Sequence, residues 1–113
     1  MSIDLFPTVS ASVWAVKTSN YTVVAGDKII ANHPSTAFSL TLPSSPSVGD
    51  SVEVKNAGAA LVTLDRNGSN IDSAAANATI PDSYYLSLVY VDATIGWLTI
   101  DRYYGSDQYI VPN

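Results

Sequence analysis

The chain has 113 residues, a net charge of −5 at pH 7 and no cysteine. This length fits a single domain, and the lack of cysteine excludes a disulfide framework and a thiolate site. The five basic residues are scattered, which disfavours nucleic-acid binding; no apolar run is long enough to insert in a membrane, and the start lacks the basic and apolar regions of a signal peptide.

The first part of the chain predicts an arm followed by three short strands. Residues 1–12 precede the first strand-like segment, and we interpret them as a docking arm. Strands are predicted over residues 13–17, 21–24 and 27–32, because each is a short run of β-branched and other apolar residues bounded by turn-forming residues.

The next two strands are separated by prolines. Residues 37–42 alternate apolar and polar side chains, which is typical of a half-buried strand. Pro43 and Pro46 have no N–H to donate to a ladder, so this strand must end at Leu42. The alternation restarts over residues 51–56. The Ser/Gly-containing linker between the two strands indicates a crossing from one sheet to another rather than a tight hairpin.

Three further strands are predicted over residues 61–65, 84–92 and 96–101. The segment 84–92 is largely apolar on both faces, which favours a central position in its sheet. The Asn-Gly pair at 67–68 predicts a type I′ hairpin turn, because both central residues of that turn need a positive φ. Residues 73–78 could form one helical turn, but the segment is too short to be stable alone, so we predict a loop.

These elements together predict an all-β fold. About eight short strands with regular turn signals indicate a small antiparallel β-sandwich or a jelly-roll-like domain over residues 13–101. Residues 102–113 contain several tyrosines and no evident partner strand, so we interpret them as a C-terminal arm.

Few residues are candidates for chemistry. His33 is the only histidine, and a zinc site would need three or four His or Cys ligands, so an exposed turn residue is the simpler interpretation. Most aspartates fall at strand ends or turns, where their carboxylates bind nearby backbone amides. The segment Asp65–Asp72 resembles a calcium loop only weakly, because the ligand spacing and the closing Glu are missing. We predict no catalytic residue, no metal and no cofactor.

Apolar and aromatic residues instead favour an interface. Only 13% of the residues are charged, against about a quarter in average domains, so partner chains are expected to cover part of the apolar surface. Tyrosines are concentrated in the last third of the chain and suit an interface or sheet packing. The predicted interface residues are Phe6, Tyr84, Tyr85, Tyr103, Tyr104, Tyr109 and Ile110.

Four segments, YTVVAGDKIIAN, FSLTLPSSPSVGDSVEVKNAG, VTLDRNGSNIDS and LSLVYVDATIGWLTI, resemble a β-rich structural module of tailed-bacteriophage virion proteins. The match covers roughly residues 14–100, and its most specific part is residues 40–50. Two features depart from the module: His33-Pro34 replaces a small turn, and the tyrosine-rich segments are not part of its pattern.

The resemblance implies a non-enzymatic, homotrimeric virion protein made in the host cytoplasm. Because the module is nearly the whole chain, we expect a small capsid decoration or cement protein that binds major capsid, neck or tail proteins. The alternative is a tail-fibre or head-fibre module that binds host-surface glycan through Tyr84, Tyr85, Tyr103 or Tyr104. A glycosidase would need two acids converging in a cleft.

Overall fold

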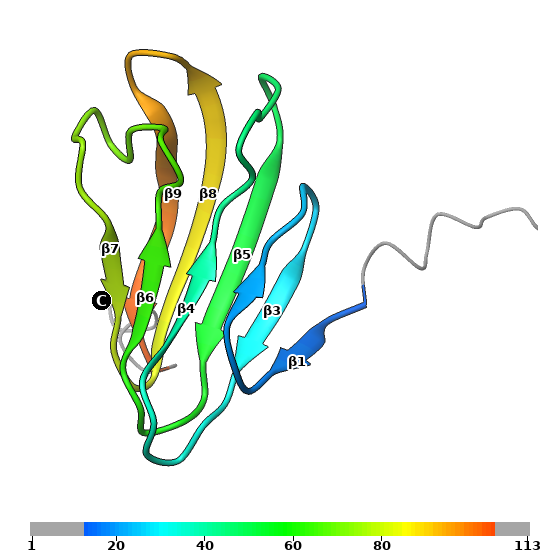
Figure 1. Ribbon diagram of the computed structural model, residues 1–113, viewed down its shortest axis with the longest axis vertical. Coiled ribbons are helices and arrows are strands. Elements are labelled where there is room, and N and C mark those ends of the chain that lie inside the picture. The colour runs from blue at the N-terminus through cyan, green and yellow to red at the C-terminus, as the bar shows by residue number, and fades with distance from the viewer. Residues whose placement is uncertain (1–12, 106–113) are drawn as a thin grey trace, which may run out of the picture.

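The computed structural model describes residues 13–105 and shows an all-β domain, which confirms the predicted class. Two sheets lie face to face around one core (Figure 1). The strands are β1 (Ala15–Lys17), β2 (Tyr21–Thr22), β3 (Lys28–Ala31), β4 (Phe38–Thr41), β5 (Ser51–Asn56), β6 (Val62–Asp65), β7 (Ala78–Ile80), β8 (Tyr84–Asp92) and β9 (Gly96–Tyr104). Among the described residues no helix is long and apolar enough to span a membrane.

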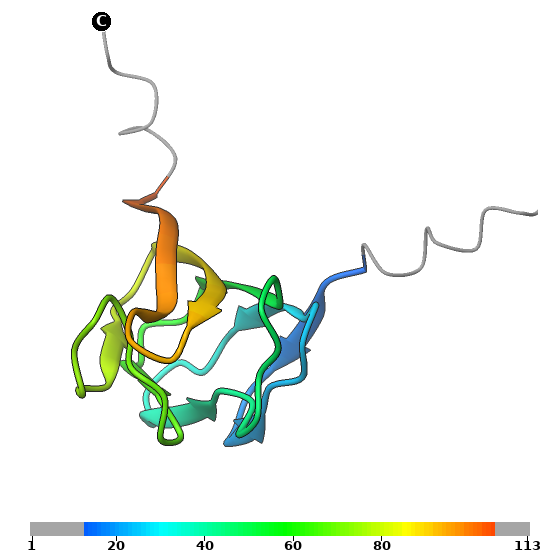
Figure 2. The same cartoon turned by 90° about the horizontal axis from the view of Figure 1, so that it is seen from above.

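The first six strands wind back and forth between the two sheets. Strands β1, β3 and β5 are parallel neighbours in the five-stranded sheet, and β2, β4 and β6 are parallel neighbours in the four-stranded sheet. Figure 2 looks down the strands and shows the two layers. The antiparallel arrangement predicted from the sequence is therefore wrong for these six strands. Alternation with a period of two shows which residues share a face, but it carries no information on strand direction.

The last three strands are antiparallel and cover one end of this winding. Strand β7 pairs with β6, β8 pairs with β5, and β9 pairs with β8. The orders are β1-β3-β5-β8-β9 in one sheet and β2-β4-β6-β7 in the other. At the opposite end, β1 and β2 are the edge strands of the two sheets. The two ends of the winding therefore differ, and we call the β1/β2 end the open end.

Alternate residues of the strands fill the space between the sheets. Because successive side chains of a strand point to opposite faces, the apolar members of each alternating run meet in one core. This confirms the inward sets predicted for residues 37–42 and 51–56. The largest fully buried apolar side chains are Trp97, Ile29, Leu40, Leu42, Leu64, Ile80, Leu88, Val23, Val52, Val54 and Val62.

A polar residue, Asn56, is fully buried at the end of β5. Its amide nitrogen donates to the carbonyl oxygens of Ala60 and Ile80 at 2.9 and 2.8 Å, and its amide oxygen accepts the Gly58 N–H at 3.0 Å. Asn56 thus ties the turn after β5 to β7 across the core.

The predicted crossing at residues 42–50 is confirmed, because β4 lies in the four-stranded sheet and β5 in the five-stranded sheet. Gly49 adopts a φ of 96°, which an L-residue reaches only with strain. The Asp50 carboxylate accepts the Ser47 N–H at 2.8 Å and closes the turn that leads into β5.

The long loop after β6 confirms one prediction and corrects another. Residues 73–78 form no helix, as predicted. The pair at 67–68 has φ angles of 48° and 92°, which fit a type I′ turn, and the Ser69 N–H donates to the Arg66 carbonyl at 3.1 Å. The hairpin prediction is nevertheless wrong, because a loop rather than a paired strand follows this turn before β7 begins.

The predicted arms fall mostly outside the described residues. These undescribed parts are residues 1–12 with Phe6 and residues 106–113 with Tyr109 and Ile110. Arg102–Tyr104, predicted as the start of the C-terminal arm, are instead the last residues of β9 and pair with β8. Because these residues pair with β8, the tyrosines of β8 and β9 lie side by side.

Candidate interaction surface

We call the side of the five-stranded sheet that faces away from the core the outer face. One row of side chains crosses all five strands on it, each paired in register with the next: Val16, Ile30, Lys55, Tyr85 and Tyr103. Direct cross-strand neighbours have Cβ atoms about 5 Å apart, so these side chains contact one another. Four of the five are apolar or aromatic, and Lys55 lies between the apolar pair Val16 and Ile30 and the aromatic pair Tyr85 and Tyr103.

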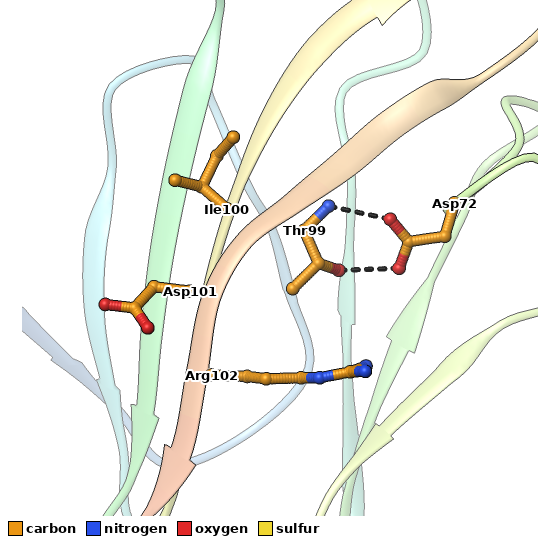
Figure 3. A pocket seen from close by; sticks show the side chains of 5 residues that line it. All are labelled: Asp72, Thr99, Ile100, Asp101 and Arg102. Carbon is orange, nitrogen blue, oxygen red and sulfur yellow. Dashed lines mark hydrogen bonds between the residues drawn. The ribbon is translucent and has the colours of Figure 1, made fainter. Parts of the chain in front are cut away.

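A second apolar group lies farther along β8 and β9, beyond the polar pair Ser87 and Asp101. Val89 is half-buried and pairs with Leu98, and Ile100 is 57% exposed. The register shifts near Ser87, so Ile100 is the extra residue of a β-bulge. Figure 3 shows the consequence. The side chains of Ile100 and Asp101 project to one side of β9, whereas those of Thr99 and Arg102 project to the other.

Lys28, Glu53 and Lys55 on the outer face are partnered within the chain, whereas Asp101 on the same face is exposed. Lys28 lies 4.0 Å from Glu53, and the Tyr85 hydroxyl donates to the Glu53 carboxylate at 2.7 Å. Lys55 donates to the Ser83 carbonyl at 3.0 Å and lies 5.8 Å from the centre of the Tyr103 ring. Such exposed pairs add little stability. They do mean that a protein docking on this face would bury few uncompensated charges.

The Tyr85 hydroxyl should ionise at a higher pH than an ordinary tyrosine. Burial and the hydrogen bond to Glu53 raise its pKa from 10.0 to about 12. Because folding favours the neutral phenol, this contribution to stability is complete below pH 10 and is lost as the pH rises to about 12. We expect Tyr85→Phe to remove a tyrosine that ionises near pH 12 from an alkaline absorbance titration. A difference between the two titrations centred near pH 10 would contradict this assignment.

The four tyrosines predicted as one interface form two cross-strand pairs. Tyr85 and Tyr103 stack on the outer face with ring centres 4.8 Å apart and an interplanar angle of 26°. Tyr84 and Tyr104 meet at 4.7 Å and 58°, on the other side of the same sheet. Each pair contributes on the order of 1 kcal/mol beyond its area burial. The structure thus brings all four to one end of β8 and β9 but divides them between two faces; their contact with a partner stays a prediction.

The outward side of the four-stranded sheet has a different character. Its strands present two rows that are paired in register: Ser39, Thr63 and Thr79 in one, and Thr22, Thr41 and Asp65 in the other. We call this surface the hydroxyl face. Hydroxyl groups donate and accept hydrogen bonds with water in any orientation, so this face suits solvent. The four-stranded sheet therefore presents more hydroxyl groups than the outer face, although exposed Leu61 and Val24 follow the same alternation.

A shallow groove of about 580 Å³ lies beside β9 and is lined by Asp72, Thr99, Ile100, Asp101 and Arg102 (Figure 3). The Asp72 carboxylate accepts the Thr99 N–H at 2.8 Å and its hydroxyl at 2.7 Å. The Asp72 and Asp101 side chains lie on opposite sides of β9 in Figure 3. The groove thus does not aim two carboxylates at a common point, as glycoside hydrolysis requires.

His33 lies in the predicted turn but is half-buried rather than exposed. Its Nδ1 accepts the N–H groups of Ser35 and Thr36 at 3.1 and 2.9 Å, so the ring holds the turn that leads to β4. Within residues 13–105, no group of three His, Asp or Glu side chains converges as a metal site would require.

Several aspartates have the structural role predicted from the sequence. Asp27, Asp50, Asp65 and Asp92 each accept at least one nearby backbone N–H, at distances between 2.7 and 3.0 Å. Asp65 and Asp72, the ends of the weak calcium-loop match, bind Asn67 and Thr99 respectively. Their carboxylates therefore stabilise turns and the loop that crosses β9.

No protein-family model matches the chain, and no curated protein matches it. The functional assignment therefore depends on the contrast between the outer face and the hydroxyl face. A surface that carries apolar and aromatic side chains and several internally paired charges can bind a complementary protein surface, and a surface rich in hydroxyl groups can remain in water.

Proposed function

We propose that the chain is a non-enzymatic bacteriophage virion protein, a capsid decoration or cement protein that attaches through its outer face. The observation that carries this proposal is the contrast between the row from Val16 to Tyr103, in which four of the five side chains are apolar or aromatic, and the hydroxyl face. The resemblance of residues 14–100 to a virion module supports the same function. In this proposal the two sheets form a rigid, sandwich-like domain that binds the capsid through the outer face.

Attachment of this kind stabilises a shell by mass action. A protein that binds the assembled capsid but not its separate subunits adds its binding free energy to assembly. Aromatic side chains such as Tyr85 and Tyr103 are enriched at the centres of such interfaces. Their stacking restricts both rings before binding, which lowers the entropy lost on docking.

The homotrimer implied by the resemblance remains part of the proposal. Three copies around a threefold site of the shell would each set the outer face on a neighbouring capsid subunit. The trimer would then connect neighbouring capsid subunits across the boundaries between them. Residues 1–12 and 106–113, predicted as arms, would add contacts from outside the described domain.

The proposal is tested with two variants that each place a carboxylate near the centre of one face. Val89→Glu alters the outer face, and Thr63→Glu alters the hydroxyl face. We expect Val89→Glu to reduce co-sedimentation with particles of the encoding phage more than about tenfold, because a buried unpaired charge is costly. Thr63→Glu should bind like the unchanged chain. Thermal unfolding of each free variant checks that both remain folded.

Two results would overturn this function. One is equal binding by Val89→Glu and the unchanged chain; the other is mass spectrometry showing no copy of the chain in purified particles. A glycan array on which the unchanged chain binds and Tyr85→Ala or Tyr103→Ala does not would favour the alternative, a host-glycan module of a fibre.

A further inference from the structure

The open end of the winding carries main-chain groups that point away from the domain. The Lys17 carbonyl accepts an N–H from the end of β3 at 2.9 Å, and the Val23 N–H donates to the end of β4 at 2.8 Å. In a parallel ladder, the N–H and C=O of one residue point to the same side, and the next residue points to the other side. The N–H and C=O of Val16 and Thr22 therefore face outward at the open end.

Apolar side chains gather around these outward groups. Val13, Val16 and Val24 are 69%, 59% and 57% exposed, and the Lys28 ammonium lies 5.8 Å from the centre of the Trp14 ring. Val13, Trp14 and Val16 belong to the β1 segment, whereas Val24 follows β2 in the other sheet. Strand edges with exposed apolar side chains readily pair with other chains, and the terminal turns of wound β-structures are normally covered. The other end meets this requirement with β7, β8 and β9; among the described residues nothing comparable covers the open end.

The geometry of the first arch favours a symmetric partner. Val16 and Thr22 lie equally far along the chain from Ser19, the middle of the arch between β1 and β2. Edge-to-edge pairing of both sheets requires one two-fold axis, perpendicular to both sheets, that passes beside both residues. It would place Val16 opposite Val16 and Thr22 opposite Thr22 of another copy, each in an antiparallel pair.

We propose that a second copy of this chain covers the open end, so that each sheet continues across a two-fold axis into the same sheet of the partner. The register is compatible with the charges. Lys17 would stand opposite Ala15 of the partner, and its ammonium already lies 4.0 Å from the centre of the Tyr21 ring in its own copy. No charged side chain of β1 or β2 meets a like charge. The contact uses the main chain at the edges of β1 and β2, whereas the side chain of Val16 is also one end of the row proposed for attachment. The attachment test therefore uses Val89 on β8, away from this edge.

The absence of cysteine makes a direct test available. In an antiparallel pair that shares both hydrogen bonds, the Cα atoms lie about 5.5 Å apart, which is within the range of a disulfide. Under mild oxidation of the full chain we expect Val16→Cys and, separately, Thr22→Cys to give disulfide-linked dimers. The control is Val48→Cys, which is 76% exposed on the linker between β4 and β5 and should remain unlinked.

A second variant tests the hydrogen bonds. Val16→Pro removes an N–H that faces outward, so the isolated domain should tolerate it as edge strands tolerate proline. Sedimentation over a concentration series should show a dimer for the unchanged chain and a dimer more than about tenfold weaker for Val16→Pro. Thermal unfolding of the dilute variant checks its fold.

The outcomes separate this contact from the proposed attachment function. A monomer at all concentrations, as expected if residues 1–12 cover the open end, would overturn the inference. So would a trimer in which neither cysteine links. Either result leaves the effect of Val89→Glu on particle binding unchanged, whereas a dimer that does not bind particles would overturn the attachment function alone.

Discussion

Replacing Asn56 by alanine is expected to lower the free energy of unfolding by about 3 kcal/mol. The substitution removes three hydrogen bonds and leaves the Gly58 N–H and the carbonyls of Ala60 and Ile80 buried without a side-chain partner. Each unsatisfied buried group costs about 1–3 kcal/mol, although some relaxation will reduce the sum. Urea unfolding followed by tryptophan fluorescence would measure the change.

The matched control is Asn77→Ala, because Asn77 is exposed and accepts one hydrogen bond, from the Arg66 N–H at 2.9 Å. Its loss should cost less than about 1 kcal/mol, since water can replace the missing acceptor. Equal effects of the two substitutions would show that the network around Asn56 does not hold the turn to β7.

Replacing Gly96 by alanine is expected to lower the free energy of unfolding by about 4 kcal/mol. Gly96 has a φ of 73°, and an added Cβ would overlap the main chain of Asn70, which crosses directly over it. Backbone cannot yield as a flexible side chain can. The overlap would also separate Asn70 from Trp97, whose N–H donates to the Asn70 carbonyl at 2.8 Å.

Gly68→Ala separates backbone strain from overlap. Gly68 has a φ of 92°, but an added Cβ would meet no atom within 4 Å. This variant should lose about 1 kcal/mol through strain alone. If Gly96→Ala were no more destabilising than Gly68→Ala in the same urea titration, the loop after β6 would not be packed on β9 as described.

Local pattern predicts the strands and their buried faces well. Alternation within residues 37–42 and 51–56 identified the inward side chains, and the prolines at 43 and 46 identified the crossing between sheets. Both follow from properties of single residues and their neighbours: side-chain direction alternates along any strand, and proline cannot donate to a ladder. The aspartates that close turns were predictable for the same reason.

Strand direction and long-range contacts are not encoded at this level. The parallel winding of β1 to β6 depends on where each arch delivers the next strand, which alternation does not specify. The buried position of Asn56 depends on Ile80, far along the chain. The bulge at Ile100 and the crossing of Asn70 over Gly96 likewise arise from tertiary packing.

The candidate surface was only partly predictable. The tyrosines were found because an over-used aromatic residue is visible in composition. Ile30, Val89 and Leu98 were missed as a surface, because each lies on the outward side of a strand whose neighbours in the sheet were unknown. Once the strand order is known, the register aligns Ile30 with Tyr85 and Tyr103 through Lys55, and pairs Val89 with Leu98.

The most direct test of the central claim is the orientation of the domain on a phage particle, measured by cryo-electron microscopy of particles that carry the chain. The account predicts that the five-stranded sheet lies against the shell, with Tyr85 and Val89 at the contact, and that Thr41 and Thr63 face solvent. A map with the hydroxyl face against the shell, or with the five-stranded sheet fully in solvent, would contradict it.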